Sequence, residues 1–190
     1  MRLLFILVWG ISSNLVGSQS WKEIDFRPGL LLKELKDLRG PEKFYFQEVV
    51  LPDSVVNAQE INGKYFHVRN GEKLFYTVYI GRVNSCRTGG CSSPQAEHKD
   101  SEFEFFDYFI LFDPKGKIVS VRVFNYEATH GHEVTIKGWL KQFYGYDGTK
   151  NLRVGKEVDS ISGATISVYG IVNDIRLKTV LLAYVRLQKD

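Results

Sequence analysis

Three hydroxyl side chains stand close together in the C-terminal part of this sequence, in a setting that suits an anion. They are Ser162, Thr165 and Ser167. Gly163 allows the backbone to approach a ligand closely, and Ala164 adds little bulk beside it. A helix is expected to follow, and the first N–H groups of a helix attract phosphate and other anions. The same hydroxyls could instead cap that helix, which stabilises a protein by about 1 kcal/mol.

The helix expected after these hydroxyls is long and has one apolar face. From Ser167 onward, side chains recur at intervals of three and four residues, as they do on the buried face of a helix. They are Val168, Ile171, Val172, Ile175, Thr179 and Leu182. The sequence therefore predicts a long C-terminal helix that packs on a core and begins at the hydroxyl-rich stretch.

Two hairpins are predicted upstream of this helix. Aromatic and β-branched residues at 64–83 flank Asn70-Gly71, a dipeptide typical of a tight turn between antiparallel strands. The strand-like runs 105–112 and 118–124 are joined by Asp113-Pro114-Lys115-Gly116, with Pro early and Gly late in the turn. Adjacent hairpins, rather than alternating strands and helices, indicate an α+β fold.

Two shorter helices are also expected. Leucines at 30–38 recur at helical spacing between Pro28-Gly29 and Gly40-Pro41, which predicts a helix that supports the domain from its N-terminal side. Residues 134–143 carry apolar side chains at intervals of three and four, which predicts a short central helix. The expected architecture is an antiparallel sheet built from hairpins, packed with a short central helix and a long C-terminal helix.

Composition and cysteine content narrow the class of protein. The chain has 190 residues, 44% of them hydrophobic, which suffices for one compact core. Its 25 basic and 22 acidic residues form no basic block, so nucleic acid is not an expected partner. Residues 1–20 have the charged, apolar and small-polar order of a secretory signal peptide. Export would permit Cys86 and Cys91, in the long loop expected at 85–101, to form a disulfide.

The stretch D-S-I-S-G-A-T at residues 159–165 resembles the flavin attachment motif of the FMN-binding domain family, Asp-x-x-Ser/Thr-Gly-Ala-Thr/Ser. This family includes subunits of the Nqr and Rnf respiratory complexes and related exported flavoproteins. Two more segments are similar to the family in the expected order: F-D-P-K-G-K-I-V-S-V-R-V at 112–123 and W-L-K-Q-F-Y-G at 139–145. The resemblance covers roughly residues 62–175.

This resemblance implies that FMN is carried covalently, through a phosphoester on Thr165. A flavin transferase that uses FAD and Mg²⁺ would move FMN onto the Thr165 hydroxyl and release AMP. The recognition residues that come with the motif are Asp159, Ser162, Gly163 and Ala164. The chain is accordingly divided into a signal peptide at 1–20, an N-terminal helical support segment at 21–61 and an FMN-binding domain at 62–190.

A second expected contact with the flavin departs from the family's pattern. Where better-known members carry Glu-Thr-Pro-Gly, this chain has Glu127-Ala128-Thr129-His130-Gly131-His132, with an extra residue and a histidine in place of the proline. By position, the residues expected near the isoalloxazine ring are Thr129, His130 and Gly131, with Tyr126 at the end of a strand. A metal site at the two histidines is not expected, because two ligands leave zinc incompletely coordinated.

Together these features predict an exported electron-transfer flavoprotein. The flavin would supply the redox chemistry, and no acid-base pair or nucleophilic triad stands out, so an electron carrier is expected rather than an enzyme with its own small substrate. Its partners would be the flavin transferase and a membrane-bound or exported redox protein, in the periplasm or at the outer face of the cytoplasmic membrane. Two alternatives stay open: a flavin-free secreted binding module that uses the loop at 85–101, and an FMN-dependent reductase.

Overall fold

A five-stranded antiparallel sheet forms the centre of the computed structural model, which describes residues 23–40, 43–58, 61–87 and 103–187. The strands follow one another across the sheet in chain order. They are β1 (Tyr45–Val49), β2 (Gly63–Asn70), β3 (Lys73–Arg87), β4 (Phe103–Phe112) and β5 (Ile118–Tyr126). Every pair of neighbours is antiparallel, so each connection within the described sheet joins adjacent strands.

Both predicted hairpins are present. Asn70 and Gly71 lie at the turn between β2 and β3, where Gly71 has a φ of 56°, as the tight turn requires. At the turn between β4 and β5, the Asp113 carboxylate accepts hydrogen bonds from the backbone N–H groups of Lys115 and Lys117, both at 2.9 Å. The turn chemistry read from the sequence therefore sets the pairing of four of the five strands.

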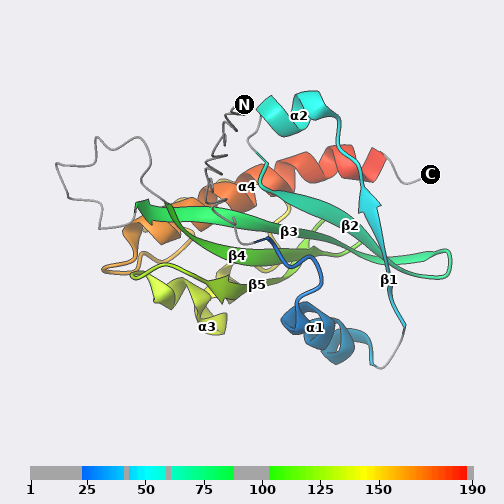
Figure 1. The fold of residues 1–190 in the computed structure, drawn as a ribbon, viewed down its shortest axis with the longest axis horizontal. Helices are drawn as coiled ribbons and strands as arrows, with labels where there is room; N and C mark the ends of the chain where they lie inside the picture. The colour runs from blue at the N-terminus through cyan, green and yellow to red at the C-terminus, as the bar shows by residue number, and fades with distance from the viewer. Residues whose placement is uncertain (1–22, 41–42, 59–60, 88–102, 188–190) are drawn as a thin grey trace, which may run out of the picture.

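Helices cover both faces of the sheet (Figure 1). The long helix α4 (Thr165–Leu187) packs on one face, and α1 (Gly29–Arg39) packs on the other. Leu31 and Leu35 of α1 are fully buried, and Glu34 accepts a hydrogen bond from Ser120 of β5 at 2.9 Å. The predicted α+β fold and the predicted helices at both ends of the chain are confirmed.

The prediction of one continuous central helix at 134–143 is wrong. Three short elements occupy this stretch: η1 (His132–Thr135), α3 (Lys137–Leu140) and η2 (Lys141–Phe143). Between the first two, Ile136 has an extended backbone with ψ of 119°, and 55% of its side chain is exposed. Leu140 and Phe143 are buried as the spacing indicated. The pattern thus identified most of the buried residues but not the break.

The N-terminal region contributes more than the predicted support helix. The edge strand β1 pairs with β2, and a short helix α2 (Asp53–Ala58) follows it. Neither was predicted, because β1 shows no alternating pattern and Val49 is its one buried residue. The boundary expected at residues 61–62 stays a prediction, and the signal peptide at 1–20 lies outside the described residues.

A polar cluster is buried between α4 and the sheet. Lys178, 1% exposed, lies with its Nζ atom 2.8 Å from Oδ1 of Asp174, one turn earlier on α4. Tyr108 donates a hydrogen bond to Asp174, and Tyr65 donates one to the backbone oxygen of Lys178 at 2.7 Å. The ring of Tyr79 lies 5.3 Å from Lys178 Nζ, but its hydroxyl has no hydrogen-bond partner among the described residues.

The buried tyrosines predict a loss of stability in alkaline solution. Burial, reinforced by the charge of Asp174, raises the pKa of Tyr65, Tyr79 and Tyr108 well above the ordinary 10.0. Above about pH 10, the unfolded chain therefore releases protons that the folded chain retains, and the free energy of unfolding falls as the pH rises. Each tyrosine contributes a slope of up to about 1.4 kcal/mol per pH unit. Urea denaturation from pH 8 to about pH 11 measures this slope.

The variant Tyr79→Phe provides the matched control. It removes one titrating group and an unpaired buried hydroxyl, so it should be at least as stable as the parent at pH 8 and lose stability less steeply. A slope unchanged by this substitution would show that Tyr79 does not contribute to the alkaline loss.

Candidate functional site

The segment at 159–165 displays its polar residues and buries its apolar ones. Val158 and Ala164 are buried at 0% and 2% exposure, and Ile161 between them packs partly buried against the core. The remaining residues of the motif point outward and are exposed: Asp159, Ser160, Ser162, Gly163 and Thr165. An apolar anchor at every third position therefore attaches this segment to the domain and leaves the motif's polar side chains at the surface.

A tight turn brings the segment into α4. The backbone N–H of Ala164 donates to the Ile161 oxygen at 3.2 Å, and Gly163, the third residue of this turn, has a φ of 81°. This conformation favours glycine strongly. Val168 then donates to Ala164 at 2.9 Å, so the helix begins at Thr165, and the N–H groups of its first turn have no partner within the helix.

The described residues do not support the alternative in which one of the hydroxyls caps the start of α4. No side-chain oxygen among them accepts a hydrogen bond from the backbone N–H groups of residues 165–167. The Ser167 hydroxyl lies 2.8 Å from the Ser85 hydroxyl, and Ser167 is 2% exposed. Thr165 is the hydroxyl that faces solvent at the start of the helix, where an attached phosphate would meet the positive end of the helix dipole.

Two side chains from outside the motif fix the backbone of Asp159. The indole N–H of Trp139 donates to the Asp159 backbone oxygen at 2.9 Å, and the Asp159 backbone N–H donates to Gln142 Oε1 at 2.8 Å. Gln142 also donates to the backbone oxygen of Trp139 at 3.2 Å. Sequence reasoning placed both residues in the expected central helix but assigned neither to the site, because a contact across 17 to 20 residues leaves no periodic signal.

The residues that precede this segment, 153–158, form a compact turn closed by an ion pair. The Arg153 guanidinium donates to both carboxylate oxygens of Glu157, at 2.6 and 3.0 Å. These hydrogen bonds lower the pKa of Glu157 to about 2. Val154 and Val158 form a β-bridge within the same turn. The chain therefore reaches Asp159 in a defined conformation.

A hollow of about 300 Å³ opens beside Thr165. Its walls come from the turn at 154–161 and from the first turns of α4. Val154 and Ile161 give it an apolar surface, the buried Val168 lies behind them, and Ser160 adds a hydroxyl. An exposed hydroxyl next to a partly apolar hollow is a setting that the phosphate and ring of FMN fit.

The second predicted group of residues lies at the opposite side of the same helix turn. Gly131 has a φ of 86°, and a Cβ atom placed on it would lie 2.6 Å from the Ser167 hydroxyl and 3.2 Å from the Tyr126 hydroxyl. Both the conformation and the space therefore require glycine here. Because consecutive helix residues turn by about 100°, Ser167 lies about 200° around α4 from Thr165.

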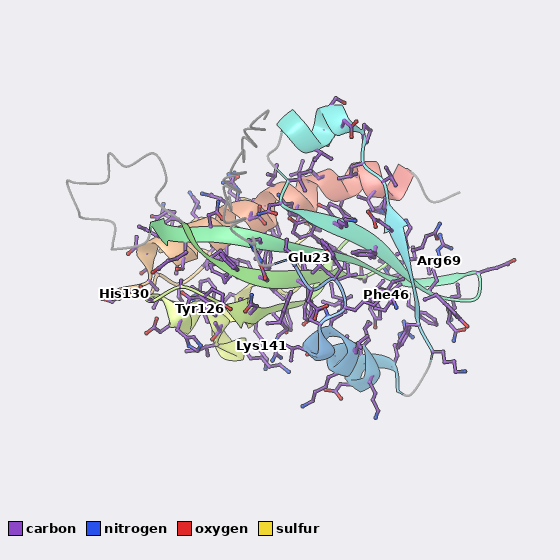
Figure 2. The ribbon with its side chains drawn as sticks, viewed as in Figure 1. Glu23, Phe46, Arg69, Tyr126, His130 and Lys141 are labelled. Atoms are coloured by element: carbon purple, nitrogen blue, oxygen red, sulfur yellow. The ribbon has the colours of Figure 1, made fainter. Side chains whose placement is uncertain are left out.

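A chain of hydroxyl groups connects this loop to α4 and β3. Tyr126 donates to the backbone oxygen of His130 at 2.6 Å, so its oxygen accepts from Ser167, at 3.4 Å, and Ser167 accepts from Ser85. Burial raises the pKa of Tyr126, and the hydrogen bond from Ser167 partly opposes this effect. Figure 2 shows Tyr126 and His130 at the end of the sheet where α4 begins.

The histidine of this loop is oriented by a buried carboxylate. Glu104, 8% exposed, accepts hydrogen bonds from the backbone N–H of Thr129 at 3.1 Å and from its hydroxyl at 2.8 Å. Because that hydroxyl donates to Glu104, it accepts from His130 Nδ1, which lies 2.9 Å away. The proton is thereby assigned to Nδ1, and the imidazole remains exposed at the surface.

The predicted site residues thus form two groups on either side of the start of α4. Thr165, Ser160 and Ile161 border the hollow, whereas Tyr126 and Gly131 adjoin Ser167, with Thr129 and His130 in the same loop as Gly131. Their roles toward a flavin stay predictions. The predicted pairing of Cys86 with Cys91 lies outside the described side chains. Within the described ranges, no three His, Cys, Asp or Glu side chains group together as metal ligands would.

The comparison with known families identifies this region. The model of the FMN-binding domain matches residues 106–176, a stretch that contains both groups of residues. The resemblance noted from the motif is confirmed, and the chain carries an FMN-binding domain of this family. No curated protein matches the chain. None of the described helices is both long enough and apolar enough to cross a membrane.

The contact between Gly131 and Ser167 can be tested by filling its space. Gly131→Ala should lower the free energy of unfolding by about 2–4 kcal/mol, from the left-handed backbone and from the clash with the Ser167 hydroxyl. Gly145→Ala is the matched control, because Gly145 has a similar φ of 81° but no atom within 4 Å of an added Cβ. Its cost should be about 1–2 kcal/mol. Chemical denaturation measures both.

Removing the opposing hydroxyl should relieve the clash. Ser167→Ala, combined with Gly131→Ala, is expected to recover part of the stability lost in the single variant. Equal losses in Gly131→Ala and Gly145→Ala would contradict the tight contact between the loop and α4.

Proposed function

We propose that this protein carries FMN covalently through a phosphoester on Thr165 and transfers electrons between redox proteins outside the cytoplasm. One observation carries the proposal. Within the FMN-binding domain, the stretch at 159–165 presents its polar side chains at the surface, and the exposed Thr165 hydroxyl borders a hollow. A segment that another enzyme must modify has to be accessible in this way.

Attachment requires the Thr165 oxygen to act as the nucleophile. A flavin transferase would bring FAD and Mg²⁺ to this hydroxyl. The Thr165 oxygen forms a new bond to the phosphorus of the FMN half, the bond to the AMP half breaks, and the hydroxyl proton is released. The resulting phosphodiester keeps one negative charge, which the N–H groups at the start of α4 stabilise. Asp159, Ser162, Gly163 and Ala164 are the residues that the transferase would recognise.

FMN, when bound, supplies reversible electron transfer at its ring. The chain's own residues fix the attachment point. Trp139 and Gln142 hold the backbone of Asp159, and Ile161 and Ala164 anchor the turn. The match to the FMN-binding domain favours this function over the flavin-free binding module. An electron carrier also needs its cofactor near the surface, where a partner can approach it, and Thr165 is exposed.

Location outside the cytoplasm is part of the proposal. Residues 1–20 have the order of a secretory signal peptide. Covalent attachment suits such a location, since a flavin lost there could not readily be replaced. The electron donor or acceptor would be a membrane-bound or exported redox protein.

The decisive experiment is intact mass measurement and peptide mapping after coexpression with a flavin transferase. The peptide that contains Thr165 should gain the mass of one FMN less one water. Thr165→Val should lose this increment completely, because valine keeps the shape but has no hydroxyl, whereas Thr165→Ser should retain it. Thr149→Val, at another exposed threonine, is the matched control and should be modified like the parent.

Two outcomes would contradict the proposal. If the parent peptide stays unmodified after coexpression with an active transferase, FMN is not attached covalently to this protein. Rapid turnover of the flavinylated protein with a soluble electron donor and a small acceptor would instead favour the FMN-dependent reductase.

A further inference from the structure

A buried carboxylate lies beneath the loop at 127–132, at the end of the sheet where α4 begins. Glu104 on β4 is 8% exposed and accepts two hydrogen bonds from Thr129, one from its backbone N–H at 3.1 Å and one from its hydroxyl at 2.8 Å. Acidic side chains are seldom buried unless they are paired, and here the partner is the loop. Glu104 lies outside the stretch that the family model matches, residues 106–176, and no pattern in the sequence marked it.

These hydrogen bonds determine where the next residue, His130, carries its proton. An ionised carboxylate only accepts hydrogen bonds, so the Thr129 hydroxyl donates its one proton to Glu104 and accepts from His130 Nδ1, 2.9 Å away. Nδ1 therefore carries the proton of the neutral imidazole. The other nitrogen, Nε2, is an acceptor when the imidazole is neutral and an N–H donor when it is protonated. No described residue forms a hydrogen bond with Nε2.

The loop that carries His130 meets the same helix turn as the proposed attachment residue. Gly131 adjoins Ser167 in the first turn of α4, and Thr165 begins that turn. A ribityl phosphate chain separates the ring of FMN from the oxygen to which it is attached, so the ring itself lies away from Thr165. Exposed groups around the helix start are therefore within its reach. The His130 side chain is such a group (Figure 2).

Several titratable groups lie on the elements that hold this loop. Within the described residues they are Glu104 on β4, Tyr126 at the end of β5, Glu127 in the loop, and His132 and Glu133 in η1. The first two turns of α4 contain no charged side chain. Burial raises the pKa of Tyr126, which keeps its hydroxyl neutral near pH 7. The histidines are the side chains of this group that ordinarily change charge between about pH 5 and pH 8.

We propose that Glu104 is a positioning residue for the flavin: through Thr129 it holds His130 with its proton on Nδ1, so that Nε2 faces an FMN ring tethered at Thr165 and, once protonated, stabilises the reduced ring. This inference rests on the proposed function. Reduction adds negative charge to a flavin ring, and a cationic N–H beside it favours the reduced form. Better-known members of the family carry proline here, which neither titrates nor donates, so this effect is a property of the present chain.

The first test measures the tautomer of His130 without flavin, by nitrogen NMR of the histidine side chains at about pH 8, where histidine is ordinarily neutral. The His130→Gln variant identifies the His130 signals. The parent and Thr129→Ser, which keeps the hydroxyl, should carry the proton on Nδ1. Thr129→Val removes the acceptor and should lose this preference. Glu104→Gln should move the proton to Nε2, because an amide can donate to the Thr129 hydroxyl, which then donates to Nδ1.

The second test measures the reduction potential of the flavin between about pH 5 and pH 8. Each protein is flavinylated by coexpression with a flavin transferase and first checked by mass for FMN on Thr165. Protonation of His130 should favour reduction about tenfold, so the parent at low pH should exceed His130→Gln by about 30 mV for two electrons. This difference should vanish as the pH rises and the imidazole loses its charge. His132→Gln, at the other histidine of this region, is the matched control and should follow the parent.

The two tests separate this inference from the proposed function. A parent His130 with its proton on Nε2 overturns the positioning role of Glu104, and this result does not depend on flavin. Absence of FMN from the parent protein overturns the proposed function and the contact of His130 with a flavin together. FMN on Thr165 with the same pH dependence in the parent and in His130→Gln overturns only the inference.

Discussion

The first two turns of α4 pack against β3 and the loop at Gly131 with almost no space between the backbones. Three small residues make this approach feasible. Gly131 meets the Ser167 hydroxyl, and a Cβ atom on Gly170 would lie 3.0 Å from Cγ1 of Val83 on β3. The Ser167 side chain contacts the loop at Gly131, and its hydroxyl forms a hydrogen bond with the Ser85 hydroxyl on β3. Because Thr165 and Ser167 lie nearly opposite each other around the helix axis, close packing at Ser167 turns Thr165 toward solvent. The exposure of Thr165, the proposed attachment residue, thus follows from what its neighbours bury.

The same packing determines how the two groups of predicted residues meet the start of α4. The motif borders the hollow beside Thr165, whereas Gly131 of the loop contacts Ser167. The loop reaches α4 through a hydroxyl chain that ends at the His130 backbone oxygen, and its own threonine and histidine are oriented by Glu104. A departure from the family's usual loop sequence can be accommodated there, because the contacts that fix the helix come from Gly131 and Tyr126. The segment at 159–165 depends on different neighbours, Trp139 and Gln142.

Local signals in the sequence were sufficient for the parts of the fold that local chemistry determines. Asn70-Gly71 and the Asp113 turn specified two hairpins, and the spacing of apolar residues specified α1 and α4. The edge strand β1 was not predicted, because only its last residue, Val49, is buried and its side chains therefore do not alternate between apolar and polar. The central helix was predicted as continuous because its buried residues keep helical spacing even though the extended backbone of Ile136 breaks the helix. For the site, the motif could be located from the sequence, whereas its contacts with Trp139 and Gln142 depend on the tertiary fold.

A segment that another protein modifies and that then carries a cofactor has to satisfy two requirements that compete for the same atoms. Recognition needs side chains that are not already used, while a tethered cofactor needs an attachment point that does not move. In this segment the two tasks fall to different atoms. The Asp159 backbone is bound by Trp139 and Gln142, and the anchors are apolar side chains at Ile161 and Ala164. The carboxylate of Asp159 and the hydroxyls of the motif take no part in this anchoring and remain exposed. The conformation of this segment is therefore fixed by backbone hydrogen bonds and apolar anchors and not by its polar side chains, so a short surface stretch can be both fixed and open to recognition.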